Sequence, residues 1–144
     1  MIVEHGVGHY DAGWRQIEAE WFMNARGAAK RENVRNGFEM CEISDKAFLY
    51  FPKVSNIRKD TRMCFYAACN NPHGCTIEVR EDSSQGNLLG VCEIPHTTET
   101  SRDDWRGYRT FMCQLRNTSG CKNICLVFKG IGDNLCRLDW FRFV

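Results

Sequence analysis

Two carboxylates lie close together in the segment QIEAEWF, residues 16–22. The segment alternates with the period of a β-strand, so Glu18 and Glu20 are expected on one face, about 7 Å apart along the chain. Carboxylates at this spacing raise each other's pKa unless a positive charge lies between them. A bound cation could supply that charge if the strand bends to bring the two together. The alternative is that Glu18 and Glu20 form salt bridges with Arg15, Arg137 or Arg142.

Catalytic motifs are absent from the sequence, because no GxSxG, HExxH or P-loop pattern occurs. The four histidines fall in expected loops or near the N-terminus: His5, His9, His73 and His96. Glycosidases need two carboxylates on opposite sides of a cleft. Asp103 and Asp104 are adjacent in sequence and therefore face different ways. The sequence indicates a protein that is not an enzyme.

The cysteines are numerous, and their number is odd: Cys41, Cys64, Cys69, Cys75, Cys92, Cys113, Cys121, Cys125 and Cys136. No CxxC pair occurs, which disfavours zinc ribbons and thioredoxin-like sites. Most lie in strand-like runs, where a reduced cysteine packs as a small apolar residue. Two alternatives stay open. One is a set of disulfides, with Cys69–Cys75 the simplest local pair, and the other is a metal site formed by Cys69, His73 and Cys75.

The elements that must position these residues are short strands separated by polar turns such as NNPHG and EDSSQGN. Strands are expected over residues 16–22, 38–43, 47–54, 61–69, 75–81, 87–94, 105–115, 122–129 and 136–143. The segment ARGAAKRENVR, residues 25–35, could form a helical turn but lacks an apolar face. The pattern predicts an all-β fold, an antiparallel β-sandwich of jelly-roll type. Residues 1–14 are expected to be a flexible lead-in or linker and residues 15–144 the sandwich.

The composition is that of one globular domain, with 144 residues of which 43% are hydrophobic and 26% charged. Its 19 basic and 18 acidic residues give a formal net charge of +1, so nothing favours a nucleic-acid partner. No apolar run approaches the ~20 residues of a membrane span, and the N-terminus lacks the pattern of a signal peptide. We expect neither nucleic acid nor membrane as a partner. The location stays open between extracellular and bacterial cytoplasmic, as part of a larger enzyme.

Three motifs in order resemble a known family. QIEAEWF stands near the start, DDWRGYRTFMCQL lies in the middle and RLDWFRFV closes the chain. Together they resemble the family 6 carbohydrate-binding modules, over residues 16–144. Those modules have a galactose-binding-like jelly-roll sandwich, begin with an IEAE strand and close on NLDWFRF or a near variant. The runs KRENVRNGFE, LYFPKV and LVFKG are most similar to modules that follow family 43 glycoside hydrolases.

The resemblance implies a structural calcium ion that joins the first strand to the last. Its ligands would be Glu18, Glu20 and Asp139, together with backbone carbonyls of a nearby loop. Calcium is a hard cation that takes about six to eight oxygen ligands, so such a set of carboxylates suits it. The ion would be a structural staple and not a catalyst.

The resemblance also implies a sugar-binding site at the loop end of the sandwich. There an aromatic pair stacks on the apolar faces of a sugar ring, and an Asn near the C-terminus binds its hydroxyls. Trp105 matches the Trp of this pattern, and Tyr108 the second aromatic of the same segment. Phe38 is the aromatic available for the other plate, although strict spacing would place Met40 or Cys41 there.

The chain departs from the family pattern at NLDWF, where Arg137 replaces the Asn. An arginine donates to several hydroxyls or binds a carboxylate with two bonds, so it could favour an acidic sugar such as a uronic acid. It could also block the site, or pair with Glu18 or Glu20. Asn134, in the loop GIGDN, offers an amide in place of the missing one.

The expected function is that of a non-catalytic module. It would bind a plant cell-wall polysaccharide (xylan or a related β-glycan) or its oligosaccharides, and target a covalently attached glycoside hydrolase to its substrate. We expect a monomer. The alternative is a degenerate module that serves as a structural or interaction appendage, or a lectin-like glycan-binding domain. An exposed pair formed by Trp105 and Phe38 would favour the first interpretation.

Overall fold

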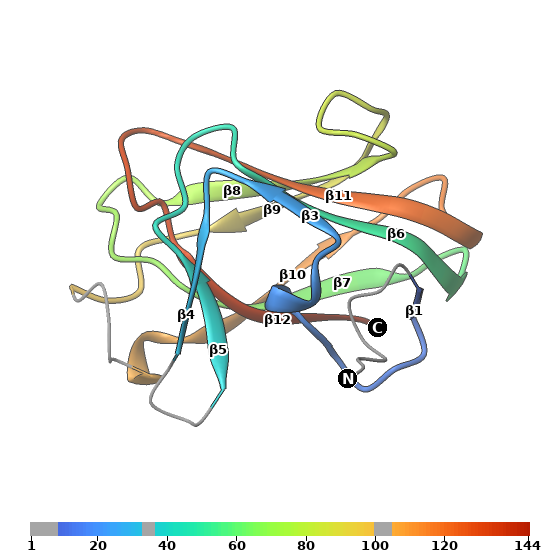
Figure 1. Cartoon of the computed structure of the whole chain (residues 1–144), viewed down its shortest axis with the longest axis horizontal. Helices are drawn as coiled ribbons and strands as arrows, with labels where there is room; N and C mark the ends of the chain where they lie inside the picture. Colours follow the sequence, from blue (N-terminus) through green and yellow to red (C-terminus); the bar gives the residue numbers. More distant parts are fainter. Residues whose placement is uncertain (1–8, 33–36, 100–104) are drawn as a thin grey trace.

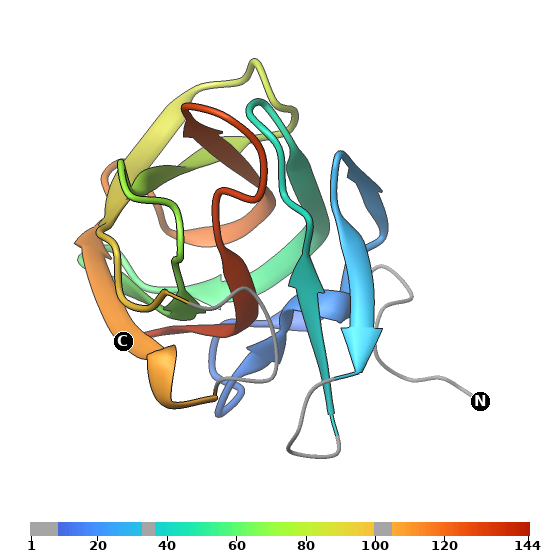
Figure 2. The ribbon, with the colours of Figure 1, turned by 90° about the vertical axis from the view of Figure 1, so that its left-hand side faces the viewer.

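The structure, a computed structural model, describes residues 9–32, 37–99 and 105–144, with the backbone alone for Trp105. Two six-stranded sheets pack face to face (Figures 1 and 2). The first sheet has the order β1-β6-β11-β8-β9, and β3 also pairs with β6. Its strands are β1 (Tyr10–Asp11), β3 (Asn24–Arg26), β6 (Phe48–Ile57), β8 (Cys75–Glu81), β9 (Leu88–Ile94) and β11 (Gly120–Gly130).

The second sheet has the order β10-β7-β12-β5-β4, and β2 also pairs with β12. Its strands are β2 (Ile17–Glu18), β4 (Ala29–Glu32), β5 (Phe38–Cys41), β7 (Arg62–Ala68), β10 (Arg109–Gln114) and β12 (Arg137–Phe143). All pairs are antiparallel except β1 with β6. The predicted all-β sandwich is therefore confirmed. No helix in the described residues is long and apolar enough to cross a membrane.

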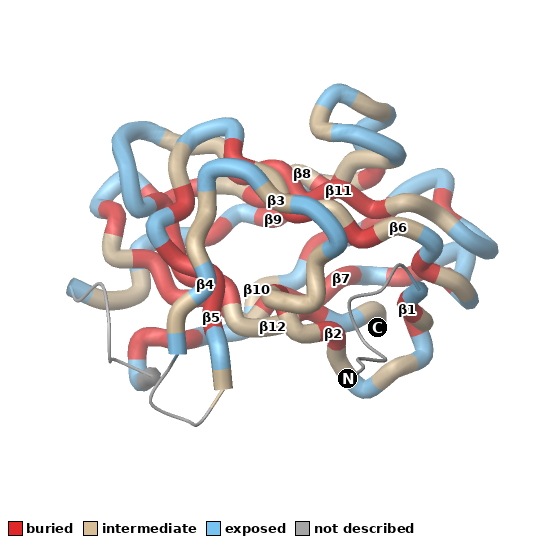
Figure 3. Tube along the Cα trace, viewed as in Figure 1, coloured by how far each residue is buried: buried red, intermediate tan, exposed pale blue. Residues whose placement is uncertain are grey.

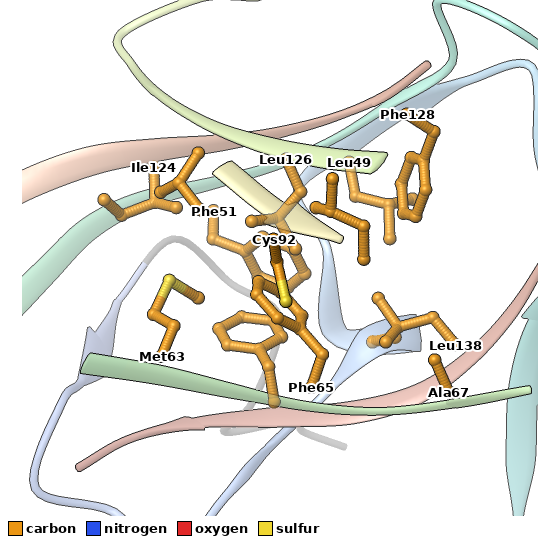
Figure 4. Packing of buried hydrophobic residues seen from close by; sticks show 14 of the residues in the cluster. Leu49, Phe51, Met63, Phe65, Ala67, Cys92, Ile124, Leu126, Phe128 and Leu138 are labelled. Atoms are coloured by element: carbon orange, nitrogen blue, oxygen red, sulfur yellow. The ribbon is translucent and has the colours of Figure 1, made fainter. Parts of the chain in front are cut away.

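The hydrophobic core lies between the two sheets, where the buried parts of the strands face each other (Figure 3). Leu49 and Phe51 of β6 point inward from the first sheet, and Phe65 of β7 meets them from the second (Figure 4). The rings of Phe51 and Phe141 lie 4.9 Å apart at an interplanar angle of 78°. This edge-to-face geometry is favoured between aromatic rings and links β6 to β12 across the core.

Strand β12 lies in the interior of the second sheet and pairs with β7, β5 and β2. The register of its pairing with β7 shifts between Leu138 and Trp140, which is the mark of a β-bulge. Leu138 and Phe141 both belong to the core. The bulge at Asp139 allows this, because strict alternation would send residues 138 and 141 to opposite faces. Trp140, in contrast, is only half-buried.

One local prediction is wrong, for a reason of tertiary packing. The strand predicted over residues 16–22 ends at Glu18, and Ala19–Trp21 form a 3₁₀ turn. That turn buries Ala19 completely, and the hydroxyl of Tyr10 donates to the carbonyl of Trp21. The helical turn considered within residues 25–35 is replaced by strands β3 and β4. Gly27, with a φ of 75°, turns the chain between them.

The predicted lead-in, residues 1–14, is in part attached to the sandwich. Tyr10 is completely buried, and its strand β1 pairs with β6 at Val54 and Ser55. The N–H of Ala12 donates to the carbonyl of Ser55 at 2.8 Å. Residues 10–12 therefore belong to the folded unit. Residues 1–8 of the predicted lead-in lie outside the described residues.

All nine cysteines are free thiols, and every one except Cys121 is buried. Several of them belong to the core cluster, among them Cys69, Cys92 and Cys113. Cys92 lies among the apolar side chains between the sheets (Figure 4). In this structure the thiols pack as small apolar groups, which is the first of the interpretations that the sequence left open.

Candidate functional site

A polar pocket opens at the end of the sandwich, where the second sheet meets the loop between β11 and β12. Its volume is about 420 Å³. Its walls come from β4, the segments that follow β5 and β7, and the start of β12: Arg31, Cys41, Glu42, Ser44, Asn70, Asp133, Asn134, Cys136 and Arg137. Two of the predicted sugar-binding residues, Asn134 and Arg137, therefore line the same pocket.

The loop between β11 and β12 is fixed against the body of the sandwich. Leu135 donates its N–H to the carbonyl of Ile43 at 2.8 Å, and Asn71 donates from Nδ2 to another carbonyl of the loop at 2.8 Å. Asn134 has a φ of 52°, as does Glu42 on another wall of the pocket. This left-handed conformation is uncommon outside glycine. The pocket is thus preformed by its own hydrogen bonds.

A buried ionic network forms behind one wall of the pocket, centred on Glu39. Glu39 is 2% exposed. Its Oε2 accepts bonds from Nε and Nη2 of Arg31 at 3.1 and 2.7 Å, and its Oε1 accepts the hydroxyl of Tyr108 at 2.6 Å. Nη1 of Arg137 lies 3.8 Å from that same Oε1. A buried carboxylate is tolerated only when it is paired and hydrogen-bonded in this way.

Arg137 is 4% exposed, and its guanidinium lies over the ring of Tyr108, 5.2 Å from the ring centre. Its Nε and Nη2 atoms are buried and have no hydrogen-bond partner. The sequence left several roles open for Arg137, and one of them was an ion pair. In the structure Arg137 forms an ion pair with Glu39. That carboxylate lies on β5 and belongs to neither Glu18 nor Glu20.

The predicted aromatic residues Tyr108 and Phe38 lie in different environments, and neither lines the pocket. Tyr108 is 6% exposed and stacks on Tyr66 with ring centres 4.9 Å apart. Burial, and then the charge of Glu39, raise the pKa of the Tyr108 hydroxyl. Tyr108 therefore supports the pocket from behind, through Glu39 and Arg137. Phe38 is 37% exposed, with Lys30 Nζ 4.9 Å from its ring centre, and does not line the pocket.

Trp105 begins a 3₁₀ turn, Trp105–Gly107, which leads into β10. The strand predicted from residue 105 therefore starts later, at Arg109. The side chain of Trp105 lies outside the described part of the structure. Its assignment as the aromatic platform stays a prediction, and so does the aromatic pair that it would form with Phe38.

Sequence reasoning missed most of the residues that line the pocket, among them Glu42, Asn70 and Asp133. These three follow β5, β7 and β11, and they meet because β5, β7 and β12 are neighbours in one sheet. Strand order is not visible in the sequence. Turn-rich segments such as NNPHG and GIGDN were the available signal, but they did not show which loops share one end of the sandwich.

A second aromatic arrangement lies on the face of the second sheet that points away from the core. Tyr66 of β7 pairs in register with Trp140 of β12, and their rings stack at 5.1 Å. The guanidinium of Arg142 lies over Trp140, 5.7 Å from its ring centre. With Tyr108 on the other side of Tyr66, these rings form a continuous stack. It extends from the network behind the pocket along the sheet.

The carboxylates of the opening segment come together despite the 3₁₀ turn. Burial raises the pKa of Glu20 to about 7, and the charges of Glu18 and Asp139 add to that shift. Burial also raises the pKa of Glu18, against a 2.6 Å bond from Gln16 Nε2. Oε1 of Glu20 is buried and has no hydrogen-bond partner. Carboxylate oxygens are the kind of donor that a hard cation such as calcium prefers.

No set of three His, Cys, Asp or Glu side chains within residues 9–32, 37–99 and 105–144 is arranged to hold a metal ion. The metal site that the spacing of Cys69, His73 and Cys75 suggested therefore has no support in the described residues. The three carboxylates Glu18, Glu20 and Asp139 are near neighbours without forming a complete coordination sphere. Backbone carbonyls would have to supply the rest.

Comparison with known proteins gives one consistent result. The sequence model of "Carbohydrate binding module (family 6)" matches residues 18–144. A family 6 module from Clostridium cellulolyticum, solved in complex with xylose, is 28% identical. It superposes with a TM-score of 0.81 over 93% of this chain and 98% of its own.

Two enzymes contain a similar part. A family 43 arabinoxylan arabinofuranohydrolase from Bacillus subtilis, solved with cellotetraose, is 20% identical. Its TM-score is 0.83, over 96% of this chain and 28% of its own. An arabinoxylan arabinofuranohydrolase from Paenibacillus polymyxa is 41% identical over 71 residues, which are 49% of this chain and 10% of the enzyme. The chain thus corresponds to a small part of each enzyme.

Proposed function

The chain belongs to the family 6 carbohydrate-binding modules, and from that premise we propose that its polar pocket binds plant cell-wall β-glycan of the xylan type. The module is non-catalytic, like the family. The observation that carries the proposal is the position of Asn134 and Arg137 in the walls of one preformed pocket. The sequence offers both residues as candidates for sugar contact.

The pocket offers what a sugar ring requires. Ring hydroxyls both donate and accept hydrogen bonds, and the walls carry amide donors at Asn70 and Asn134 beside carboxylate acceptors at Glu42 and Asp133. A ring also needs an aromatic plate for its apolar face. We assign that plate to Trp105, which begins the turn before β10. Polar groups set the orientation of the sugar and the plate supplies contact area.

We propose further that the module brings an attached glycoside hydrolase to its substrate. The likeness to a part of two arabinofuranohydrolases supports this proposal. Tethering raises the effective concentration of glycan near a catalytic domain and needs no direct contact between the two sites. A single pocket of this size should bind weakly, because few contacts remain after the entropic cost of association.

The test is calorimetric titration of the whole chain against xylo-, arabinoxylo-, cello- and mixed-linkage gluco-oligosaccharides. We expect binding to the xylan-type ligands, and we expect Trp105→Ala to abolish it while circular dichroism shows an intact sandwich. Phe111→Ala, in the groove between β9 and β10, is the matched aromatic control and should bind normally. If the wild-type chain binds none of these oligosaccharides, the interpretation as a structural appendage is favoured instead.

We also propose that a calcium ion is held by Glu18, Glu20 and Asp139. The unpartnered Oε1 of Glu20 supports the proposal, because a buried carboxylate oxygen needs a donor or a cation. When bound, the ion would supply two positive charges, which offset most of the negative charge of the three carboxylates. The site joins β2 and the following turn to β12, so the expected effect is on stability.

Stability is expected to fall as the pH rises from about 5 to about 8 in the absence of calcium. The pKa of Glu20 is about 7 in the folded chain against an ordinary value of 4.5. The folded state thus binds the Glu20 proton more tightly than the unfolded state does, and ionisation through this interval favours unfolding. Millimolar calcium should reverse the loss near pH 8 and have little effect near pH 5. Melting temperatures with calcium and with EDTA measure both effects.

Glu20→Gln should remove most of the pH dependence and the calcium response, and the raised pKa of Glu18 should leave a smaller dependence of the same sign. Glu93→Gln, a substitution of an exposed glutamate on β9, is the matched control and should keep both. An equal calcium response in the two variants would show that the ion binds elsewhere. An unchanged melting temperature in EDTA at pH 8 would remove the calcium proposal.

A further inference from the structure

One carboxylate serves two guanidinium groups behind the wall of the pocket. Both oxygens of Glu39 are already engaged, Oε2 by Arg31 and Oε1 by the hydroxyl of Tyr108. Arg137 approaches Oε1 only to 3.8 Å, which is beyond hydrogen-bond distance. Arg137 is therefore the less satisfied of the two partners of Glu39.

The unsatisfied part of Arg137 has a particular shape. Nε and Nη2 lie on the same edge of a guanidinium, and this edge grips a carboxylate with two parallel bonds. Arg31 uses the same two atoms on Glu39. In Arg137 both atoms are buried and have no partner. A cationic edge left without partners is unfavourable. Solvent does not reach these two atoms in this structure, so the wall at Arg137 must shift to admit two acceptor atoms that carry negative charge.

We propose that the pocket selects an acidic sugar and that Arg137 binds the carboxylate of a uronic acid carried by the glycan. This inference rests on the proposed function, because it names the substrate class of the same pocket. Neutral sugar hydroxyls could also accept hydrogen bonds from Nε and Nη2 of Arg137, but they would not offset the positive charge of the guanidinium. Asn70 and Asn134 remain available for the hydroxyls of the acidic sugar.

Two carboxylates on the pocket walls repel an acidic ligand and so limit how strongly the pocket prefers it. Glu42 and Asp133 are both exposed. Exposed charges are screened by salt over about 8–10 Å, whereas buried charges are screened much less. Arg137, at 4% exposure, therefore keeps its attraction at physiological ionic strength. Glu42 and Asp133 weaken binding chiefly at low salt.

The experiment is calorimetric titration of the whole chain with three related ligands at one ionic strength. They are xylotetraose, an aldotetraouronic acid with glucuronic acid on xylotriose, and the same acid with its carboxyl reduced to an alcohol. The last two differ only in the carboxylate. We expect the acid to bind about tenfold more tightly than its reduced form, a usual size for a charge-assisted pair.

Arg137→Lys keeps the charge and removes the two-pronged edge, so the preference for the acid should fall to about threefold or less. Arg62→Lys, an exposed substitution at the opposite end of β7 from the pocket, is the control and should keep the preference. If Arg137→Lys fails to fold, two substitutions of exposed pocket residues test the preference for the acid instead. Glu42→Gln and Asp133→Asn should each raise the ratio of acid to reduced-ligand affinity at low salt.

The outcomes separate the two proposals. Binding of acid and reduced ligand with equal affinity would overturn the selection of acidic sugars and leave the glycan-binding function standing. A preference that survives in Arg137→Lys would overturn the role of Arg137. Failure of all three ligands to bind would overturn the proposed function itself.

Discussion

Phe141→Ala is expected to lower the free energy of unfolding by about 3–5 kcal/mol, the usual range for a buried phenylalanine. Phe141 is completely buried on β12. Its ring meets Phe51 of the opposite sheet at 4.9 Å, and it also contacts Phe65 and Phe143. Loss of this ring leaves a cavity at the centre of the contact between the sheets. Urea unfolding followed by tryptophan fluorescence measures the change.

Phe38→Ala is the matched control, because it removes the same side chain from a site that is 37% exposed. It should lower the free energy of unfolding by about 1–2 kcal/mol, less than Phe141→Ala, since more than a third of Phe38 is already in contact with solvent. Equal losses in the two variants would contradict the position of Phe141 at the centre of the core. A smaller slope of the Phe141→Ala unfolding curve would point to a less compact native state.

Glu39→Gln is expected to lower the free energy of unfolding by about 3–5 kcal/mol and to weaken glycan binding. The substitution keeps the shape of the side chain and removes the negative charge that Arg31 and Arg137 share. A buried charge pair that loses one partner leaves an uncompensated charge behind, and this accounts for the large expected loss. Chemical unfolding gives the stability, and titration with xylo-oligosaccharides gives the binding.

Glu32→Gln supplies the control on the neighbouring strand β4, where the side chain is exposed. An exposed ion contributes about 0–1 kcal/mol, so this variant should be close to the wild type. If Glu39→Gln is as stable as Glu32→Gln, the network does not support the fold. If Glu39→Gln is destabilised but binds glycan normally, the network is structural and does not position Arg137 for a ligand.

Much of the fold could be predicted because the alternation of apolar residues survives in long strands. The runs expected at 75–81 and 87–94 correspond to β8 and β9 within a residue at each end. Alternation was misleading near Glu20, where a 3₁₀ turn keeps alternating residues without an extended backbone. The short strands β3 and β4 have an edge-like, polar composition, so periodicity gave no sign of them.

The site was harder to predict, because it depends on which strand ends lie side by side. Arg137 was proposed from the motif at the end of the chain and Asn134 from the loop before it, and both line the pocket. The partner of Arg137 was not found. Glu39 is distant in sequence, and it becomes a neighbour only because β5 pairs with β12 at Met40 and Leu138. A buried ion pair leaves no mark in a single sequence.

The interior position of β12 has a consequence for biosynthesis. β12 follows every other strand in the sequence, yet β7 and β5 are joined through it. While the ribosome is still making this segment, the second sheet lacks its centre and exposes the unpaired edges of β5 and β7. Pairing across such sequence distances is slow, and open strand edges invite aggregation. We therefore expect the nascent chain to depend on chaperones until β12 emerges, and to become resistant to protease in one late step.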